Sequence, residues 1–147
     1  MLVERVGNLF NFEHQAYAQG VTNLGIMGRG IATTFKTQYP LMFSEYKDLC
    51  RKGLLNPGEV QLYEEDPIIL NLITQDNHFR ANKDYLVESI KKMYVLARQK
   101  EITDIAMPEI GCGLGNLNIS DLKTSLQPFV TDSTHNVTIY HFNQLTS

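Results

Sequence analysis

Two glycine-rich stretches have the residue types and spacing that could do chemistry. The first, residues 22–30, reads TNLGIMGRG, and the second, residues 111–116, reads GCGLGN. Each follows an expected strand and precedes an expected helix, where a loop can present backbone N–H groups. Glycine permits positive φ angles and close approach of the backbone, and the first N–H groups of a helix are unpaired donors at its positive dipole end. The pattern predicts loops that bind an anion such as a phosphate.

Each loop taken alone could also be no more than a sharp turn. The first lacks the lysine and the serine or threonine of a Walker A loop, and it departs from the G-x-G-x-x-G spacing of dinucleotide-binding folds. In open α/β sheets, ligands collect outside the carboxyl ends of strands, so two such loops can close on one extended anion from opposite sides. Two loops of the same design in one domain favour binding over two structural turns.

The elements that must position these loops begin with short apolar runs. They predict six strands, over residues 2–6, 16–22, 59–63, 68–74, 103–107 and 137–142. Several runs are continuously apolar, which is typical of strands that helices cover on both faces. Strands that alternate with helices indicate an α/β layered fold.

Helical patterns lie between the strands. The clearest covers residues 84–98, with Asn82 as its N-cap and a buried stripe formed by Leu86, Ile90, Met93 and Ala97. Two further helices are expected over residues 31–38 and 41–51, interrupted by Pro40. A fourth helix is expected to follow Asn118 or Ser120.

Composition bounds the class of protein. The chain has 147 residues, 43% of them hydrophobic and 20% charged, which fits a single globular domain over residues 1–147. A formal net charge of −3 argues against general nucleic-acid binding, but it does not exclude a small anion bound by backbone groups. Cys50 and Cys112 lack metal-ligand spacing, so we expect no metal site and a reduced, cytoplasmic protein. The chain has no leader-like start and no run of ~18 apolar residues, so no membrane partner is expected.

Five segments resemble the macrodomain superfamily, in the expected order. They are VGNLF (6–10), VTNLGIMGRGIATTFKTQYP (21–40), NLITQ (71–75), MPEIGCGLGNL (107–117) and VTIYHF (137–142). The chain resembles the branch that contains terminal ADP-ribose protein glycohydrolase, the DNA ADP-ribosyl glycohydrolase antitoxins, and small phage and yeast ADP-ribose 1″-phosphate phosphatases. The resemblance implies a three-layer α/β/α fold with a central mixed six-stranded sheet. It also implies no cofactor, and it implies ADP-ribose or a derivative as partner, including ADP-ribose carried on a macromolecule.

The resemblance also implies site residues, position by position. Asn8 and Leu9 would lie at the adenine end, where Asn8 replaces the aspartate common in the family, and Phe142 would pack on the adenine. Asn23 aligns with an asparagine that contacts the distal ribose, and Thr74 ends a strand beside it. The phosphate nearer the adenosine would be held by Gly28, Arg29, Gly30, Ile31 and Ala32. The other phosphate and the distal ribose would be held by Gly111, Cys112, Gly113, Leu114, Gly115 and Asn116.

Catalysis is less defined than binding. Glycohydrolases of this branch carry a lysine where this chain has Gln75, and the protein glycohydrolase carries an aspartate where this chain has Gly115. A neutral amide cannot form a Schiff base or act as a cationic acid. Two classes therefore stay open. One is a hydrolase acting at the distal ribose, as a phosphatase or a de-ADP-ribosylating enzyme, with Asn23 and Gln75 as candidate catalytic residues. The other is a module that only reads or sequesters ADP-ribose.

Other chemically capable side chains have simpler interpretations. His78 has a side-chain type that can act as a general base, but a histidine in a polar loop is usually only solvated. Asp76 and Glu109 are acidic loop residues, which usually serve as turn or helix caps or as surface charges. Cys112 resembles a small packing residue more than a nucleophile.

Overall fold

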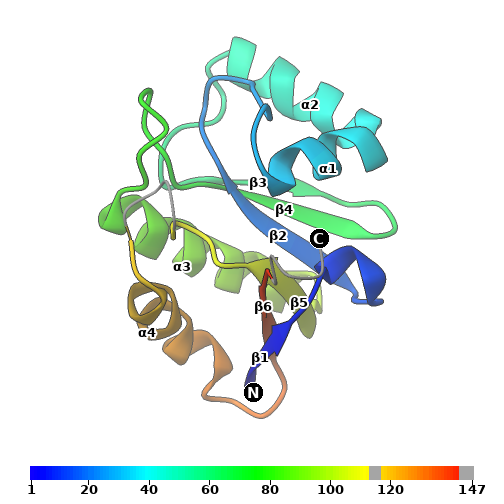
Figure 1. Cartoon of the computed structure of the whole chain (residues 1–147), viewed down its shortest axis with the longest axis vertical. Coiled ribbons are helices and arrows are strands. Elements are labelled where there is room, and N and C mark those ends of the chain that lie inside the picture. The colour runs from blue at the N-terminus through cyan, green and yellow to red at the C-terminus, as the bar shows by residue number, and fades with distance from the viewer. Residues whose placement is uncertain (113–116, 143–147) are drawn as a thin grey trace.

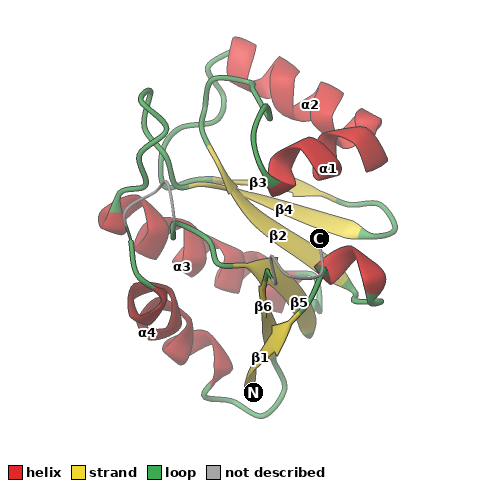
Figure 2. Ribbon diagram, viewed as in Figure 1, coloured by secondary structure: helices red, strands yellow, loops and turns green. Residues whose placement is uncertain are grey.

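The structure is a computed structural model that describes residues 1–112 and 117–142. Its strands are β1 (Leu2–Val6), β2 (Ala16–Val21), β3 (Val60–Tyr63), β4 (Ile68–Ile73), β5 (Asp104–Pro108) and β6 (Asn136–His141). Its helices are α1 (Ile31–Gln38), α2 (Pro40–Arg51), α3 (Lys83–Gln99) and α4 (Ile119–Val130), with a short 3-10 helix, η1 (Leu9–Asn11), after β1 (Figure 2). All expected strands and helices are present, with bounds within one residue of those expected. None of the helices in the described ranges is long and apolar enough to cross a bilayer.

The strands form one sheet in the order β1-β6-β5-β2-β4-β3. Only β3 runs antiparallel to its neighbour β4, and the other four pairs are parallel, so the mixed six-stranded sheet is confirmed. Because β2 and β5 are parallel neighbours, both glycine loops leave the sheet at the same edge (Figure 1).

Helices cover both faces of this sheet, α1 and α2 on one and α3 and α4 on the other (Figure 1). The expected stripe of α3 is buried against the second face, with its four side chains at most 2% exposed. On the first face, Phe35 of α1 and Met42 and Tyr46 of α2 are fully buried. Burying an apolar side chain of this size stabilises the fold by roughly 1.5–3 kcal/mol. With helices packed on both faces of the sheet, the three-layer α/β/α architecture is confirmed.

Local signals set where the helices begin. Pro40 occupies the first turn of α2, where its missing N–H costs no helical hydrogen bond. A new helix can therefore begin at Pro40, and Tyr39 alone separates it from the end of α1. Asn82 Oδ1 accepts the N–H groups of Asp84 and Tyr85, as expected of an N-cap. Asn118 caps α4 in a reciprocal capping box with Asp121. These caps fix the helix starts that follow the loops after β4 and β5.

A row of buried amides crosses three strands beneath the first glycine loop. Gln19 Nε2 donates to Asn71 Oδ1 at 2.9 Å, and Asn71 Nδ2 donates to Gln61 Oε1 at 2.8 Å. The three residues are in register on β2, β4 and β3, and Met27 of the loop lies with its sulfur 3.6 Å from Gln19 Nε2. The row therefore supports the base of the loop with polar contacts that the apolar strand pattern did not reveal.

Candidate functional site

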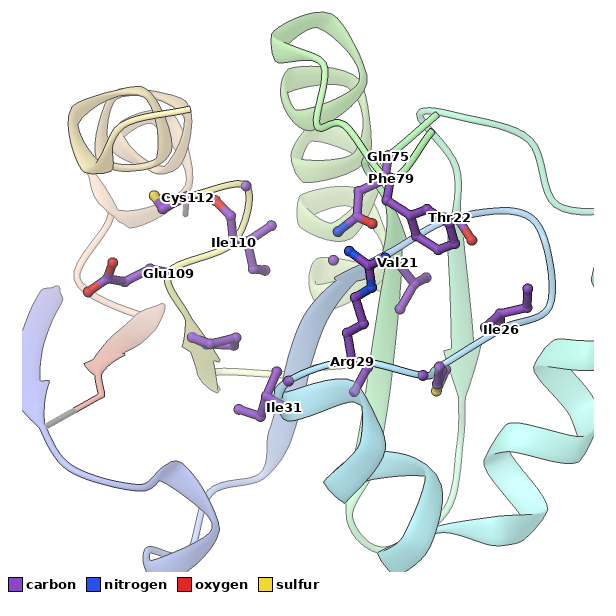
Figure 3. Close-up of a pocket in the computed structure, with 17 residues that line it drawn as sticks. Val21, Thr22, Ile26, Arg29, Ile31, Gln75, Phe79, Glu109, Ile110 and Cys112 are labelled. Atoms are coloured by element: carbon purple, nitrogen blue, oxygen red, sulfur yellow. Dashed lines mark hydrogen bonds between the residues drawn. The ribbon is translucent and has the colours of Figure 1, made fainter. Parts of the chain in front are cut away.

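A first cavity of about 360 Å³ lies between the first glycine loop and the loops that follow β4 and β5 (Figure 3). Its described lining comes from residues 20–22 and 26–32, from Gln75 and Phe79, and from residues 108–112. These segments lie at the carboxyl edge of the sheet, where ligands of open α/β folds bind. The sequence expectation that the two loops meet at one site is met for the residues that the structure describes.

A second cavity of about 590 Å³ adjoins the first. It is lined by residues 7–10 after β1, by Thr34 of α1, and by Tyr140 and Phe142 at the end of β6. Both cavities share four lining residues, which are Gly30, Ile31, Pro108 and Glu109. They therefore form one elongated cleft, of a size ordinary for small-molecule sites.

The N-terminus of α1 lies in the wall that the two cavities share. Its cap is Gly30, at φ 54° and ψ −138°, with no side-chain cap. Thr33 N–H donates to Gly30 O at 3.2 Å, whereas the N–H groups of Ile31 and Ala32 donate to no residue in the described ranges. Unpaired donors at the positive end of a helix dipole form an anion site. This is the geometry that the first glycine loop was expected to produce.

Glycine is required at the start of the second loop as well. Gly111 has φ 83°, and a Cβ there would lie 2.9 Å from Leu117 Cδ1. Its carbonyl accepts Leu117 N–H at 2.9 Å, which holds the two ends of the loop together. Gly113, Leu114, Gly115 and Asn116 lie outside the described residues, so their expected role stays a prediction.

Cys112 lines the first cavity without the features of a nucleophile. Burial raises the pKa of its thiol, and the carboxylates of Glu109 and Asp121 raise it further. Because the thiolate is the reactive form, these surroundings disfavour attack by this residue. The packing interpretation from the sequence fits this environment.

Phe79 is a cavity residue that sequence reasoning missed. It lies in the loop after β4 with φ 63°, a conformation that is uncommon for an aromatic residue. Asp76 holds the turn, because its Oδ1 accepts the N–H groups of His78 at 2.8 Å and Arg80 at 3.0 Å. These backbone donors, with Arg80 first, lower the pKa of Asp76. Asp76 is therefore a turn cap, and the only sequence signal for Phe79 was an aromatic residue in a polar loop.

Arg29 reaches across the first cavity toward the loop after β4. Its Cζ lies 5.2 Å from the centroid of the Phe79 ring, within the range of a cation–π contact. Figure 3 shows the guanidinium pointing toward the side chains of Gln75 and Phe79 and away from Ile31. The end of the cleft far from the second cavity is thus lined by the Arg29 guanidinium, the Phe79 ring and the Gln75 amide.

A charged network braces the wall that both cavities share. His141 bonds Glu109 Oε1 through Nδ1 and Glu4 Oε1 through Nε2, the latter at 2.8 Å. Lys123 Nζ bonds the other oxygen of Glu4 at 2.8 Å. The two carboxylates, Glu109 first, raise the pKa of His141. The Glu109 side chain points away from Arg29 (Figure 3), so it ties the loop after β5 to β6 and β1.

Comparison with known families agrees with this geometry. The profile of the family described as Macro domain matches residues 19–125, which is more than half of the chain. The chain belongs to the macrodomain family.

Curated relatives of this macrodomain include two DNA ADP-ribosyl glycohydrolases. That of Thermus aquaticus is 28% identical over 128 residues, 82% of this chain and 35% of the relative. That of Mycobacterium tuberculosis is 29% identical over 133 residues, 86% of this chain and 38% of the relative. The macrodomain thus spans little more than a third of these relatives. An ADP-ribose glycohydrolase of Homo sapiens is 28% identical over 116 residues, 78% of this chain and 73% of the relative.

Solved structures show the same architecture. The macrodomain of Mycobacterium tuberculosis DarG has a TM-score of 0.87 at 25% identity, covering 95% of this chain and 97% of that one. The macrodomain of Thermus aquaticus DarG has a TM-score of 0.86 at 26% identity, with the same coverage. Thermosipho africanus DarTG in complex with ADP-ribose has a TM-score of 0.82 at 24% identity, covering 92% of this chain and 40% of that one, and this likeness shows the fold.

Most predicted ligand residues of this macrodomain line the cleft. Gly28, Arg29, Gly30, Ile31, Ala32, Gly111 and Cys112 line the first cavity, as does the candidate catalytic residue Gln75. Asn8, Leu9 and Phe142 line the second, and Phe142 is 65% exposed there. Asn8 Oδ1 already accepts Phe10 N–H at 3.0 Å, which caps η1. Sequence reasoning did not single out Phe10, Tyr140 or Ile110, which also line these walls.

Two predicted site residues lie behind the walls instead. Thr74 is fully buried and lines neither cavity, because its side chain packs under Gly20, where a Cβ would lie 2.6 Å from Thr74 Oγ1. Asn23 also lines neither cavity, and its Oδ1 is covered. Neither Oδ1 of Asn23 nor Oγ1 of Thr74 has a hydrogen-bond partner in the described ranges. Of the two candidate catalytic residues, only Gln75 faces the cleft.

Proposed function

We propose that this macrodomain binds ADP-ribose, or a derivative of it, along the cleft and hydrolyses a bond at the distal ribose. The observation that carries the proposal is the pair of N–H groups on Ile31 and Ala32, which donate to no residue in the described ranges. They lie at the N-terminus of α1, where Ile31 lines both cavities and Ala32 lines the first, so a ligand with a central pyrophosphate and a sugar on each side fits the order of the features. Backbone donors need no side-chain cation, which agrees with a chain of formal net charge −3.

The two ends of the cleft give the ligand a direction. The second cavity offers Phe142, Tyr140 and Phe10, a set of aromatic side chains that suits a flat base. The first cavity offers Gln75 and the polar loop after β4, which suits a sugar and what it carries. Adenine is therefore assigned to the second cavity and the distal ribose to the first. A relative solved in complex with ADP-ribose supports the choice of ligand.

Hydrolysis is supported by the printed names of the curated relatives, which are glycohydrolases. In this chain Gln75 faces the distal end of the cleft in place of a lysine. A neutral amide can orient a water molecule or a ribose hydroxyl, but it cannot form a covalent adduct. We therefore propose that attack comes from water positioned by Gln75, without an enzyme-bound intermediate.

Two measurements test this proposal in sequence. Titration calorimetry with ADP-ribose should show saturable binding, and no heat at millimolar ligand would remove the ligand assignment. Release of inorganic phosphate or of ADP-ribose is then followed from ADP-ribose 1″-phosphate, an ADP-ribosylated oligonucleotide and an ADP-ribosylated peptide. Gln75→Ala should lower turnover by about tenfold or more while changing ADP-ribose affinity by less than about threefold. Binding without turnover of any of the three would leave a reader module.

A further inference from the structure

We propose that His141 is a positioning residue for ligand binding, which holds the Glu109 carboxylate out of the cleft and neutralises its charge. The inference rests on the proposed binding of a pyrophosphate at the N-terminus of α1, and it deepens that function. It explains how a cleft that suits an anion keeps a carboxylate in its wall.

Glu109 lies across the cleft from the proposed anion site. Residues 30–31, at the N-terminus of α1, and residues 108–109, in the loop after β5, line both cavities. The passage between the cavities thus has the start of α1 in one wall and Glu109 in the other. Among the described lining residues, Glu109 is the only aspartate or glutamate. A carboxylate that turned into this passage would repel a pyrophosphate.

The Glu109 side chain is turned out of the cleft. It points away from Arg29 and Ile31 (Figure 3), and its Oε1 bonds His141 Nδ1. Its one ion pair with a described residue is this contact with His141. The Glu109 side chain is 39% exposed, so packing alone does not fix its direction. The bond to His141 is therefore what holds the carboxylate away from the anion site.

The surroundings of His141 require its charged form. Nδ1 bonds Glu109, and Nε2 bonds Glu4 Oε1 at 2.8 Å. A neutral imidazole has a single N–H, so only the imidazolium can donate to both carboxylates. These carboxylates, Glu109 first, raise the pKa of His141. Lys123 Nζ bonds the other oxygen of Glu4 at 2.8 Å, so Glu4 has a second cation and does not depend on His141 alone.

Loss of the imidazolium has two effects on the anion site. The charge of Glu109 is no longer neutralised, and its side chain becomes free to rotate toward the N-terminus of α1. Both effects raise the free energy of a bound pyrophosphate, and neither acts on a ligand without phosphate. ADP-ribose affinity therefore depends on His141, although His141 lines neither cavity.

The test is a double-mutant cycle on the whole chain, with ADP-ribose as the probe in calorimetric titrations at low ionic strength. His141→Asn should weaken binding by about three- to tenfold at a pH of about 7. In the Glu109→Gln background the same change should weaken it by less than about twofold, because no carboxylate remains to be released. In roughly 0.5 M salt the loss caused by His141→Asn should shrink, because screening shortens the reach of the charge.

Two further readouts separate this role from a structural one. His141→Asn should weaken adenosine by less than about twofold because adenosine lacks the pyrophosphate, whereas a deformed wall beside Phe142 would weaken both probes. As pH rises from about 6 to about 9, ADP-ribose affinity of the unaltered protein should fall as the imidazolium loses its proton. In Glu109→Gln the same pH profile should be flat, a result that decides the question even where His141→Asn fails to fold.

His135→Asn is the matched control. His135 Nδ1 bonds Asp132 Oδ1 at 2.8 Å, a pair of the same kind, and neither residue lines the cleft. Its loss should leave ADP-ribose affinity unchanged. Unchanged affinity in His141→Asn, or an equal loss with and without Glu109→Gln, would overturn the inference. Absence of ADP-ribose binding by the unaltered protein would instead overturn the proposed function on which it rests.

Discussion

At the scale of single residues, two glycines of the cleft are required for different reasons. Gly30 has a positive φ of 54°, and the space where a Cβ would lie is empty. Gly20 has no such φ, but a Cβ there would lie 2.6 Å from Thr74 Oγ1 and 2.9 Å from Ile110 Cγ2. Gly30 thus serves the backbone conformation of the first glycine loop, and Gly20 serves close packing behind it.

Replacing Gly20 by alanine should therefore cost stability. The added methyl group must displace buried neighbours, so the free energy of unfolding should fall by roughly 1–3 kcal/mol in urea denaturation. Gly28→Ala is the control, because its nearest neighbour would be Ile26 Cγ2 at 3.5 Å, an ordinary contact. If Gly20→Ala unfolded at the same urea concentration as Gly28→Ala, the packing argument would be wrong.

Sequence reasoning identified the loops better than individual side chains. Glycine spacing and the flanking elements located the first glycine loop of the cleft, because those are local properties of the chain. The pairing of Arg29 with Phe79 was not accessible, since it joins residues fifty positions apart through a turn whose conformation is unusual for phenylalanine. Thr74 was assigned to the site by resemblance, but its position one residue past β4 turns its side chain into the core.

At the scale of elements, His141 links β6 to Glu4 on β1 and to Glu109 after β5. Its pKa is raised above the ordinary value of 6.5 by these two carboxylates, so its contribution to stability is complete below that value and is lost as pH rises through the raised pKa. The pKa of Glu4 is lowered from 4.5, first by Lys123 and then by His141, so the contribution of Glu4 is lost as pH falls through the lowered pKa. The network is therefore strongest between these two limits.

The variant His141→Asn should reveal the pH range over which the His141 network stabilises the fold. The difference in unfolding free energy between the unaltered protein and His141→Asn should shrink as pH rises from about 6 to about 9, because the imidazolium charge is lost. Denaturant unfolding at several pH values measures it. His78→Asn is the control, since the His78 side chain has no hydrogen-bond partner in the described ranges. A difference that stayed constant or grew with pH would contradict the charged form of His141.

The amide row gives a second prediction for the elements. Asn71→Leu should leave the Nε2 donor of Gln19 and the Oε1 acceptor of Gln61 without their partner, at roughly 1–3 kcal/mol for each. Asn136→Leu, on the exposed start of β6, should change stability by no more than about 0.5 kcal/mol. Equal urea midpoints for the two variants would show that the row does not stabilise the sheet.

Element boundaries were predictable within one residue because strand and helix periodicities are local. The order of the strands was not, because β1 pairs with β6 across almost the whole chain and β2 lies between β5 and β4. The buried amides were also missed, since hydrogen bonds between strands leave no mark in the pattern of one strand. Resemblance to a family supplied the sheet that periodicity alone left open.

At the scale of the whole molecule, segments that are distant in sequence build one cleft at the carboxyl edge of the sheet. Residues 7–10, 26–32 and 108–112 all line it, and both helical layers continue from its loops. A ligand that bridges these segments stabilises only the folded state. ADP-ribose at about 100 times its Kd should therefore raise the free energy of unfolding by about 2.7 kcal/mol, measured as a shift in thermal unfolding. Unchanged unfolding at saturation would contradict binding to the native fold.

The central claim is that backbone N–H groups at the start of α1 hold the pyrophosphate. Amide NMR of the labelled chain tests it most directly, by following the N–H resonances of Ile31 and Ala32 during titration with ADP-ribose and, separately, with adenosine. Both resonances should move downfield with ADP-ribose, as donors do when they gain an anionic acceptor, and they should stay nearly in place with adenosine. Saturation by ADP-ribose with the Ile31 and Ala32 resonances unmoved would contradict it.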